Sequence, residues 1–126
     1  KTLYKLVAVW NFRGELVTRF EDHELWHPDC NTNNIYITSR QDQIISYCRS
    51  GATSEGDTGT QPACGSIHVS DILTGKCVAR IQVPDDPSKR VRFQEALSNV
   101  TALFYTESTG EVLSGTSNGI IHVWKK

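Results

Sequence analysis

The sequence contains no methionine, and no apolar run in it approaches the roughly 18–20 residues that a membrane-spanning helix requires. It also lacks the basic segment followed by an apolar segment that marks a secretory signal peptide. The chain begins at Lys1 within a hydrophobic pattern, so we expect a fragment or a processed product. These absences predict an intracellular protein, cytoplasmic or nuclear, that does not contact a membrane.

The sequence has no block of like charge. Lys and Arg number 13 and Asp and Glu number 14, which gives a formal net charge of -1. A nucleic-acid-binding protein usually carries a basic stripe or patch, and a chain this balanced does not predict one. We therefore expect no nucleic-acid partner.

Signatures of catalysis are also missing. There is no Gly-x-Ser-x-Gly nucleophile turn and no glycine-rich phosphate-binding loop. The adjacent carboxylates Glu21-Asp22 and Asp85-Asp86 lie in predicted loops, where neighbours in sequence do not form an acid/base pair at reacting distance. The sequence predicts no enzyme, no catalytic residues and no cofactor.

The cysteines show no Cys-x2-Cys spacing of the kind found in zinc sites and redox motifs. His23, His27 and Cys30 lie close in sequence, but a zinc site would need a fourth ligand and a suitable loop. We interpret these three as loop residues, with free thiols in a reducing compartment, and predict no metal site. The sequence leaves disulfides open.

Short alternating apolar runs dominate the chain, and turn residues or polar loops separate them. The predicted strands are Lys5 to Trp10, Glu15 to Phe20, Ile35 to Thr38, Ile44 to Cys48, Ser66 to Ser70, Cys77 to Ile81, Val100 to Tyr105, Glu111 to Gly115 and Ile120 to Trp124. Helical periodicity is scarce, apart from a short helix expected near Phe93 to Leu97. The predicted fold class is all-β.

Three segments of the chain resemble one another: "KLVAVWNFRGELVTRF", "GSIHVSDILTGKCVARI" and "NGIIHVWKK". Each contains a strand, and the first two continue through a glycine turn into a second strand. His68 and His122 occupy the same place in two of these segments, two residues before Ser70 and Trp124. That repetition predicts a structural strand position for both histidines.

The repeats resemble the WD repeat, whose four-stranded antiparallel blade has strands a to d and a Trp-Asp pair ending strand c. Trp10-Asn11, Ser70-Asp71 and Trp124-Lys125 stand at that pair, and Asn118-Gly119 stands at the Asp-Gly turn. The family's Gly-His pair is missing, with Asp22-His23 as its nearest approach, so the His–Ser–Asp–Trp network of the family is incomplete. An unrelated β-sandwich would show the same alternation.

The resemblance implies antiparallel four-stranded blades that form the C-terminal part of a β-propeller over residues 1–126. Strands c and d of one blade would span about residues 5–20, a full blade 35–81, and strands a to c of the last blade 100–124. Exposed strand edges at both ends would be an aggregation hazard. We expect the remaining blades to come from an N-terminal part or from another chain.

The repeats are longer than the usual period of about 40–45 residues, and the excess falls in Glu21 to Asn34, Ser50 to Cys64 and Gln82 to Asn99. In a propeller all three loops emerge on one face. Insertions that cluster on one face of a repeat array usually mark its binding face. The sequence therefore predicts a non-catalytic protein–protein interaction scaffold that binds a peptide or a partner protein.

The candidate binding residues are charged, imidazole or aromatic side chains in or beside these loops. They are His23, Trp26, His27, Arg49, Lys89, Arg90 and Arg92. Trp26 has a competing interpretation, packing against a blade edge. The segment Ser50 to Cys64 is poor in apolar residues and is predicted to be the most mobile.

A second functional hypothesis is a substrate receptor of a cullin-RING ubiquitin ligase. Such receptors often carry Trp-Asp-x-Arg at the end of strand c, and "WNFR", with Trp10, Asn11 and Arg13, is similar to it with Asn in place of Asp. The resemblance implies an adaptor contact through these three residues.

Overall fold

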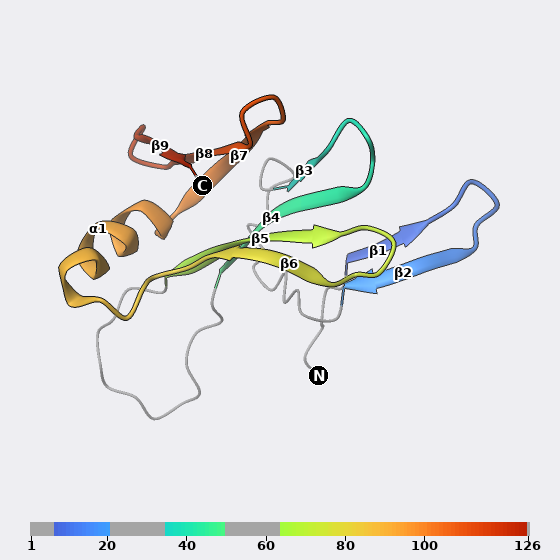
Figure 1. Ribbon diagram of the computed structural model, residues 1–126, viewed down its shortest axis with the longest axis horizontal. Helices are drawn as coiled ribbons and strands as arrows, with labels where there is room; N and C mark the ends of the chain where they lie inside the picture. Colours follow the sequence, from blue (N-terminus) through green and yellow to red (C-terminus); the bar gives the residue numbers. More distant parts are fainter. Residues whose placement is uncertain (1–6, 21–34, 50–63, 126) are drawn as a thin grey trace.

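The computed structural model describes residues 7–20, 35–49 and 64–125 (Figure 1). In chain order the elements are β1 (Val7–Trp10), β2 (Leu16–Phe20), β3 (Ile35–Ile37), β4 (Gln43–Arg49), β5 (Gly65–Asp71), β6 (Cys77–Ile81), α1 (Pro87–Leu97), β7 (Val100–Thr106), β8 (Glu111–Thr116) and β9 (Ile121–Trp124). The fold is mainly β. The described ranges contain no helix that is long and apolar enough to cross a membrane.

The strands form three antiparallel sheets. They are an N-terminal hairpin of β1 and β2, a central sheet in the order β3-β4-β5-β6, and a C-terminal sheet in the order β7-β8-β9. Figure 1 shows the central sheet between the other two, with α1 and the hairpin at opposite ends of the molecule. The expectation that Ile35 to Ile81 forms one four-stranded antiparallel sheet is confirmed.

The helix α1 is longer than the sequence pattern predicts. It begins at Pro87 rather than near Phe93, and it ends at Leu97 as expected. The Asp86 side chain accepts a hydrogen bond from the Ser88 amide, and proline at the first helical position already has a helical φ. This start signal was not weighed in the sequence, so the expected helix was placed too short, while the mainly β structure with antiparallel sheets agrees with the predicted all-β class.

The internal repeat is visible in the backbone geometry. A β-bulge lies between Val9 and Trp10 where β1 pairs with β2, and a second lies between Val69 and Ser70 where β5 pairs with β6. In the turn that follows each bulge, the carbonyl of the first turn residue accepts a hydrogen bond from the amide of a glycine and so closes the turn. The carbonyl of Asn11 accepts from Gly14, and the carbonyl of Asp71 accepts from Gly75. The residue pairs aligned by sequence therefore occupy equivalent places in two sheets.

The two histidines are equivalent as well. His68 in β5 is paired with Ser46 in β4, and His122 in β9 is paired with Ser114 in β8. Both serines are fully buried. The predicted equivalence of His68 and His122 is confirmed by this register, and it places them within sheets.

The larger core lies between the central and C-terminal sheets and beneath α1. Its buried residues are Ile45, Tyr47, Ile67, Leu97, Val100, Leu103 and Val112. The Tyr47 hydroxyl donates to the carbonyl of Leu97 at 2.6 Å, so the end of α1 is tied to β4. A smaller cluster, Ile44 and Ile72 with Val9 and Ile35 packed against it, joins the hairpin to the central sheet.

Gly75 allows the turn between β5 and β6 to lie directly against β2. Its φ is +69°, and a Cβ atom there would come within 2.7 Å of the Arg19 carbonyl oxygen. Another residue would meet both a strained backbone and a steric clash.

A carboxylate joins the turns of neighbouring sheets. Glu107, after β7, accepts from the Ser39 amide and the Ser39 hydroxyl at 2.6 Å each, and from the Tyr36 hydroxyl at 3.3 Å. The hydrogen bonds from Ser39 hold the pKa of Glu107 below its usual value.

This contact predicts a pH-dependent stability difference. Glu107→Gln should lower the free energy of unfolding at neutral pH, because an amide accepts these hydrogen bonds less well than a carboxylate. Since the folded pKa of Glu107 is lowered, its contribution is present above the ordinary value of 4.5 and is lost as the pH falls through the folded pKa. Urea unfolding between pH 7 and 3, with exposed Glu95→Gln as control, measures this. A wild-type-to-variant difference that stays constant to pH 3 would contradict it.

Candidate functional site

The predicted binding residues fall into three groups. His23, Trp26 and His27, with Cys30 beside them, lie outside the described residues, as does almost all of the segment Ser50 to Cys64. Arg49 is the last residue of β4. Lys89, Arg90 and Arg92 lie on α1, so only this third group can be examined as a surface.

The helix α1 divides its residues between the core and solvent. Ala96 and Leu97 are buried, and Phe93 packs on the core between the central and C-terminal sheets. Lys89, Arg90 and Arg92 are exposed. The end of α1 is therefore fixed by packing while its first half is exposed and presents three cations on a rigid support, and we call these three residues the α1 basic face.

Contacts with the other described residues do not explain the α1 basic face. Within the described ranges, the side chains of Lys89 and Arg92 make no hydrogen bond or ion pair, and the Arg90 guanidinium makes only a long hydrogen bond of 3.5 Å to the Asp85 carbonyl. These cations also lie in the first half of the helix, near the positive end of its dipole, where positive charge is unfavourable. Helix stability therefore gives no reason for three cations at this place.

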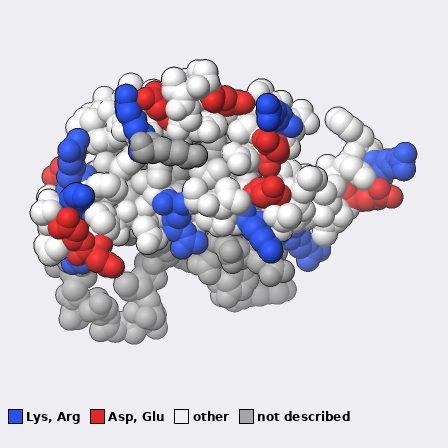
Figure 2. All heavy atoms as spheres, in the orientation of Figure 1, with Lys and Arg blue, Asp and Glu red and all other residues white. Residues whose placement is uncertain are grey.

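The carboxylates beside the α1 basic face serve the helix start. Asp86 accepts from the amide and the hydroxyl of Ser88 at 2.9 and 2.7 Å. These hydrogen bonds, the hydroxyl's first, lower the pKa of Asp86. Asp86 of the adjacent pair Asp85-Asp86 is thus the cap of α1. Figure 2 shows both signs of charge interspersed on the face in view.

Two hollows flank α1. A polar one of about 320 Å³ lies between the end of α1 and the turn from β8 to β9, and Glu95, Asn99 and Asn118 are among its lining residues. A larger groove of about 700 Å³ runs between β6 and the C-terminal sheet. We call the larger one the β6–β9 groove.

The β6–β9 groove is mostly apolar. Val69, Ile81, Phe93, Tyr105 and Trp124 contribute its apolar lining, and Arg80 and Lys125 contribute its charges. The rings of Phe93 and Trp124 meet edge to face with centroids 5.3 Å apart. Sequence analysis missed this groove because its walls come from several strands and from α1, which alternation places independently of one another.

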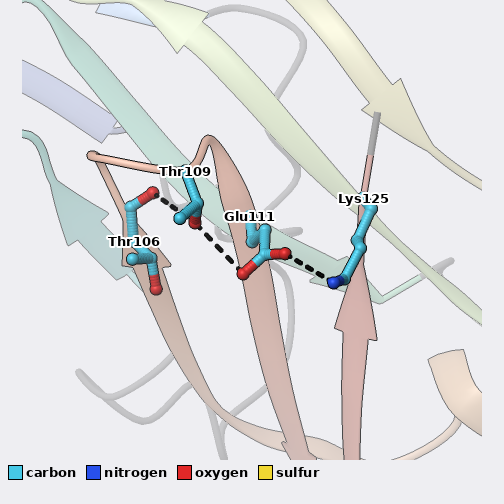
Figure 3. A network of polar contacts seen from close by, with 4 residues as sticks. All are labelled: Thr106, Thr109, Glu111 and Lys125. Carbon is cyan, nitrogen blue, oxygen red and sulfur yellow. Dashed lines mark hydrogen bonds and ion pairs between the residues drawn. The ribbon is translucent and has the colours of Figure 1, made fainter.

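Lys125 is held at the groove by a network of polar contacts (Figure 3). Its ammonium lies 2.9 Å from one oxygen of Glu111, and the Thr109 hydroxyl donates to the other oxygen at 3.1 Å. The hydrogen bond from Lys125 is the largest cause that lowers the pKa of the Glu111 carboxyl. Lys125 is therefore already paired, whereas Arg80 makes no ion pair or hydrogen bond to any other described residue.

The motif assigned to the alternative function lies in the hairpin, far from α1 in Figure 1. The Asn11 side chain accepts from the amides of Arg13 and Glu15 and donates to the Glu15 carboxylate, so it closes its own turn. Asp71 does the equivalent work in the central sheet by accepting from Thr74. Trp10 and Arg13 are exposed. Turn closure thus accounts for Asn11, while Arg13 has no such internal role.

In residues 7–20, 35–49 and 64–125 there is no group of three or more His, Cys, Asp or Glu side chains that could hold a metal ion. The cluster of His23, His27 and Cys30 lies outside these ranges. Ser66 and His68 form a hydrogen bond of 2.7 Å, but both are on β5, and His68 is buried in the central sheet.

Comparison with protein families gives one match, to a family described as a domain of unknown function (DUF7899), over residues 2–124. Neither a curated protein nor a solved structure matches the chain. The family match covers nearly the whole sequence, including all three sheets and α1.

Proposed function

We propose that this chain, which belongs to the DUF7899 family, is a non-catalytic protein–protein interaction scaffold built as blades of a WD-repeat-type propeller. The observation that carries this proposal is the α1 basic face. A rigid helix, packed on the core through Phe93, Ala96 and Leu97, presents Lys89, Arg90 and Arg92 to solvent. Cations that a packed helix holds in place, without side-chain partners in residues 7–20, 35–49 and 64–125 beyond the long Arg90 hydrogen bond, suit the recognition of an acidic protein surface.

The propeller part of the proposal is supported by repeated geometry. The bulge and the turn closure recur at Trp10-Asn11 and Ser70-Asp71. In the C-terminal sheet the Trp124 indole donates to the Ser114 hydroxyl at 2.9 Å, so a strand c tryptophan contacts a strand b serine. Three sheets that follow one another in chain order and pack face to face suit a radial arrangement of blades.

The proposed binding face contains α1 and the turn from β8 to β9. In a propeller the loops from strand d to a and from strand b to c emerge together, and α1 and Thr116 to Gly119 belong to these two classes. The polar hollow of about 320 Å³ lies between them and offers hydrogen-bonding groups next to the cations. This combination of cations and hydrogen-bonding side chains supports a protein partner with an acidic surface. The alternative, a ubiquitin-ligase adaptor contact through Trp10, Asn11 and Arg13, stays a prediction.

Charge reversal on α1 tests the proposal. The triple variant Lys89→Glu, Arg90→Glu and Arg92→Glu should lose the proteins that the wild-type chain retains in a pull-down, and the wild-type interaction should weaken with added salt because exposed charges are screened. The matched control reverses the exposed charges Arg19, Arg40 and Lys76, which changes net charge equally but lies away from α1. Equal recovery of partners by the α1 variant and the wild type would reject the proposal.

A further inference from the structure

The polar hollow beside the end of α1 contains one charged side chain. The hollow lies between the last turn of α1 and the turn from β8 to β9, and its volume of about 320 Å³ is at the small end of the range for ligand pockets. Among the described residues that line it, Glu95 alone is charged and Val91 alone is apolar. The Glu95 carboxylate makes no hydrogen bond or ion pair with any other described residue. It is therefore available to a ligand.

Helix stability does not explain the position of Glu95. Glu95 lies in the last turn of α1, where the partial negative charge of the helix end disfavours a carboxylate. That turn contains no basic residue. Arg92 is three residues earlier and so a neighbour on the helix surface, but the two side chains form no ion pair in the structure. The carboxylate and the helix end together make the hollow attractive to a cation.

Two hydroxyl donors in the hollow are already used within the protein. The Ser98 hydroxyl donates to the Gln94 carbonyl, and the Thr116 hydroxyl donates to the side-chain oxygen of Asn118. Each hydroxyl has given its one hydrogen, so its oxygen, like the Asn118 oxygen, keeps a lone pair for a further donor. With the Glu95 carboxylate, these oxygens form a set of acceptors suited to a cation that carries several N–H groups.

We propose that the polar hollow binds an arginine side chain of the partner protein. The guanidinium pairs with the Glu95 carboxylate and donates to the Asn118 side-chain oxygen, while the aliphatic part of the arginine packs on Val91. Arginine suits these acceptors because its five N–H donors lie in one plane and its charge is weakly hydrated. This inference rests on the proposed function, since it adds a basic group of the partner at the end of α1 to the acidic groups that meet the α1 basic face.

Other ligands fit the hollow less well. A phosphate or a carboxylate would be repelled by the Glu95 charge and by the negative end of the helix. A metal ion would need more ligands, and residues 7–20, 35–49 and 64–125 contain no group of three or more His, Cys, Asp or Glu side chains that could hold one. A lysine ammonium is a compact, strongly hydrated charge, so it gains less from the neutral oxygens of Ser98 and Asn118.

The first arm of the test uses an arginine side chain alone. The probe is N-acetyl-arginine methylamide, titrated into the whole chain labelled with nitrogen-15, and the amide chemical shifts report both the affinity and the place of binding. We expect a dissociation constant of about 1 mM, with shifts concentrated in residues 91–99 and 116–119. Shifts spread evenly over the other exposed carboxylates would overturn the inference.

Two matched probes identify the group that is recognised. N-acetyl-citrulline methylamide has nearly the shape of the arginine probe without its charge, and it should bind at least about tenfold more weakly. N-acetyl-lysine methylamide keeps the charge without the planar set of donors, and it should bind about threefold more weakly. Equal affinity of the arginine and citrulline probes would contradict a cation site, and equal affinity of the arginine and lysine probes would overturn the assignment to arginine.

The second arm changes the carboxylate. Glu95→Gln keeps the size of the side chain but removes its charge, and it should weaken the arginine probe about tenfold. The control Glu15→Gln removes an exposed carboxylate from the N-terminal hairpin, changes the net charge equally and should bind within about twofold of wild type. Glu95 is exposed, and the amide spectrum of each variant shows directly that it folds. Unchanged affinity in Glu95→Gln would refute the role of this carboxylate.

The two proposals can fail separately. Charge reversal of the α1 basic face should not weaken the arginine probe, because none of its three residues lines the hollow and the new charges are negative. If the probe does not bind while partner capture still depends on the α1 basic face, the arginine site is rejected and the scaffold function stands. If the probe binds at Glu95 while the α1 variant captures every partner, the arginine site stands and the proposal for the α1 basic face is rejected instead.

Discussion

Leu97→Ala is expected to lower the free energy of unfolding by about 2–5 kcal/mol, the range for removing most of a fully buried aliphatic side chain. Leu97 has no exposed surface and lies in the core where α1, the central sheet and the C-terminal sheet meet. Its carbonyl also accepts the hydrogen bond from the Tyr47 hydroxyl. A cavity at this point therefore weakens the packing that holds three elements together.

The measurement is urea unfolding followed by circular dichroism, with Val91→Ala as the control on the same helix. Val91 is 64% exposed, and alanine is the better helix former, so this change should shift stability by no more than about 0.5 kcal/mol. Leu97→Ala should also reduce binding through the α1 basic face, because the helix loses its support. Equal stability of the two variants would show that α1 is not packed on the core as the structure has it.

Alternation in the sequence was sufficient to predict the strands, and the resemblance to the WD repeat implied how they are grouped. A two-residue period places one set of side chains inward, and Ile45, Tyr47 and Ile67 in β4 and β5 are buried in that way. The repeat predicted which strands share a sheet, because strands joined by tight turns pair with each other. The bulges at Trp10 and Ser70 then follow from the same local pattern occurring twice.

Side-chain contacts between different sheets could not be predicted from the sequence patterns. The two hydrogen bonds from Ser39 to Glu107 join residues 68 positions apart, and neither residue stands out within its own turn. Arg80 is one of several cations in exposed strand positions, and its role as the unpaired charge of the β6–β9 groove depends on Lys125 being paired. The N-terminal half of α1 was missed because its exposed cations hide the helical period. The roles of His23, Trp26 and His27 stay predictions.

Trp10 at the end of β1 and Trp124 at the end of β9 form a matched pair for measuring how much the repeated tryptophan contributes to the free energy of unfolding. They occupy the same place in the repeat, but Trp10 is 59% exposed, whereas Trp124 donates to Ser114 and packs against Phe93. Trp124→Ala removes the ring from the core and leaves the buried Ser114 hydroxyl without its donor. We expect a loss toward the lower end of the about 3–5 kcal/mol seen for buried aromatic residues, since Trp124 is partly exposed.

Trp10→Ala should cost less than about 1 kcal/mol, because little of its ring is withdrawn from water in the described structure. Trp124→Phe separates the two contributions at the other site, since it keeps an aromatic ring beside Phe93 but removes the indole N–H. Its loss should fall between those of Trp10→Ala and Trp124→Ala, near the about 1–3 kcal/mol of an unsatisfied buried hydroxyl. Urea unfolding of the three variants measures this order. Equal losses for Trp10→Ala and Trp124→Ala would mean that the hydrogen bond to Ser114 and the contact with Phe93 do not stabilise the C-terminal sheet.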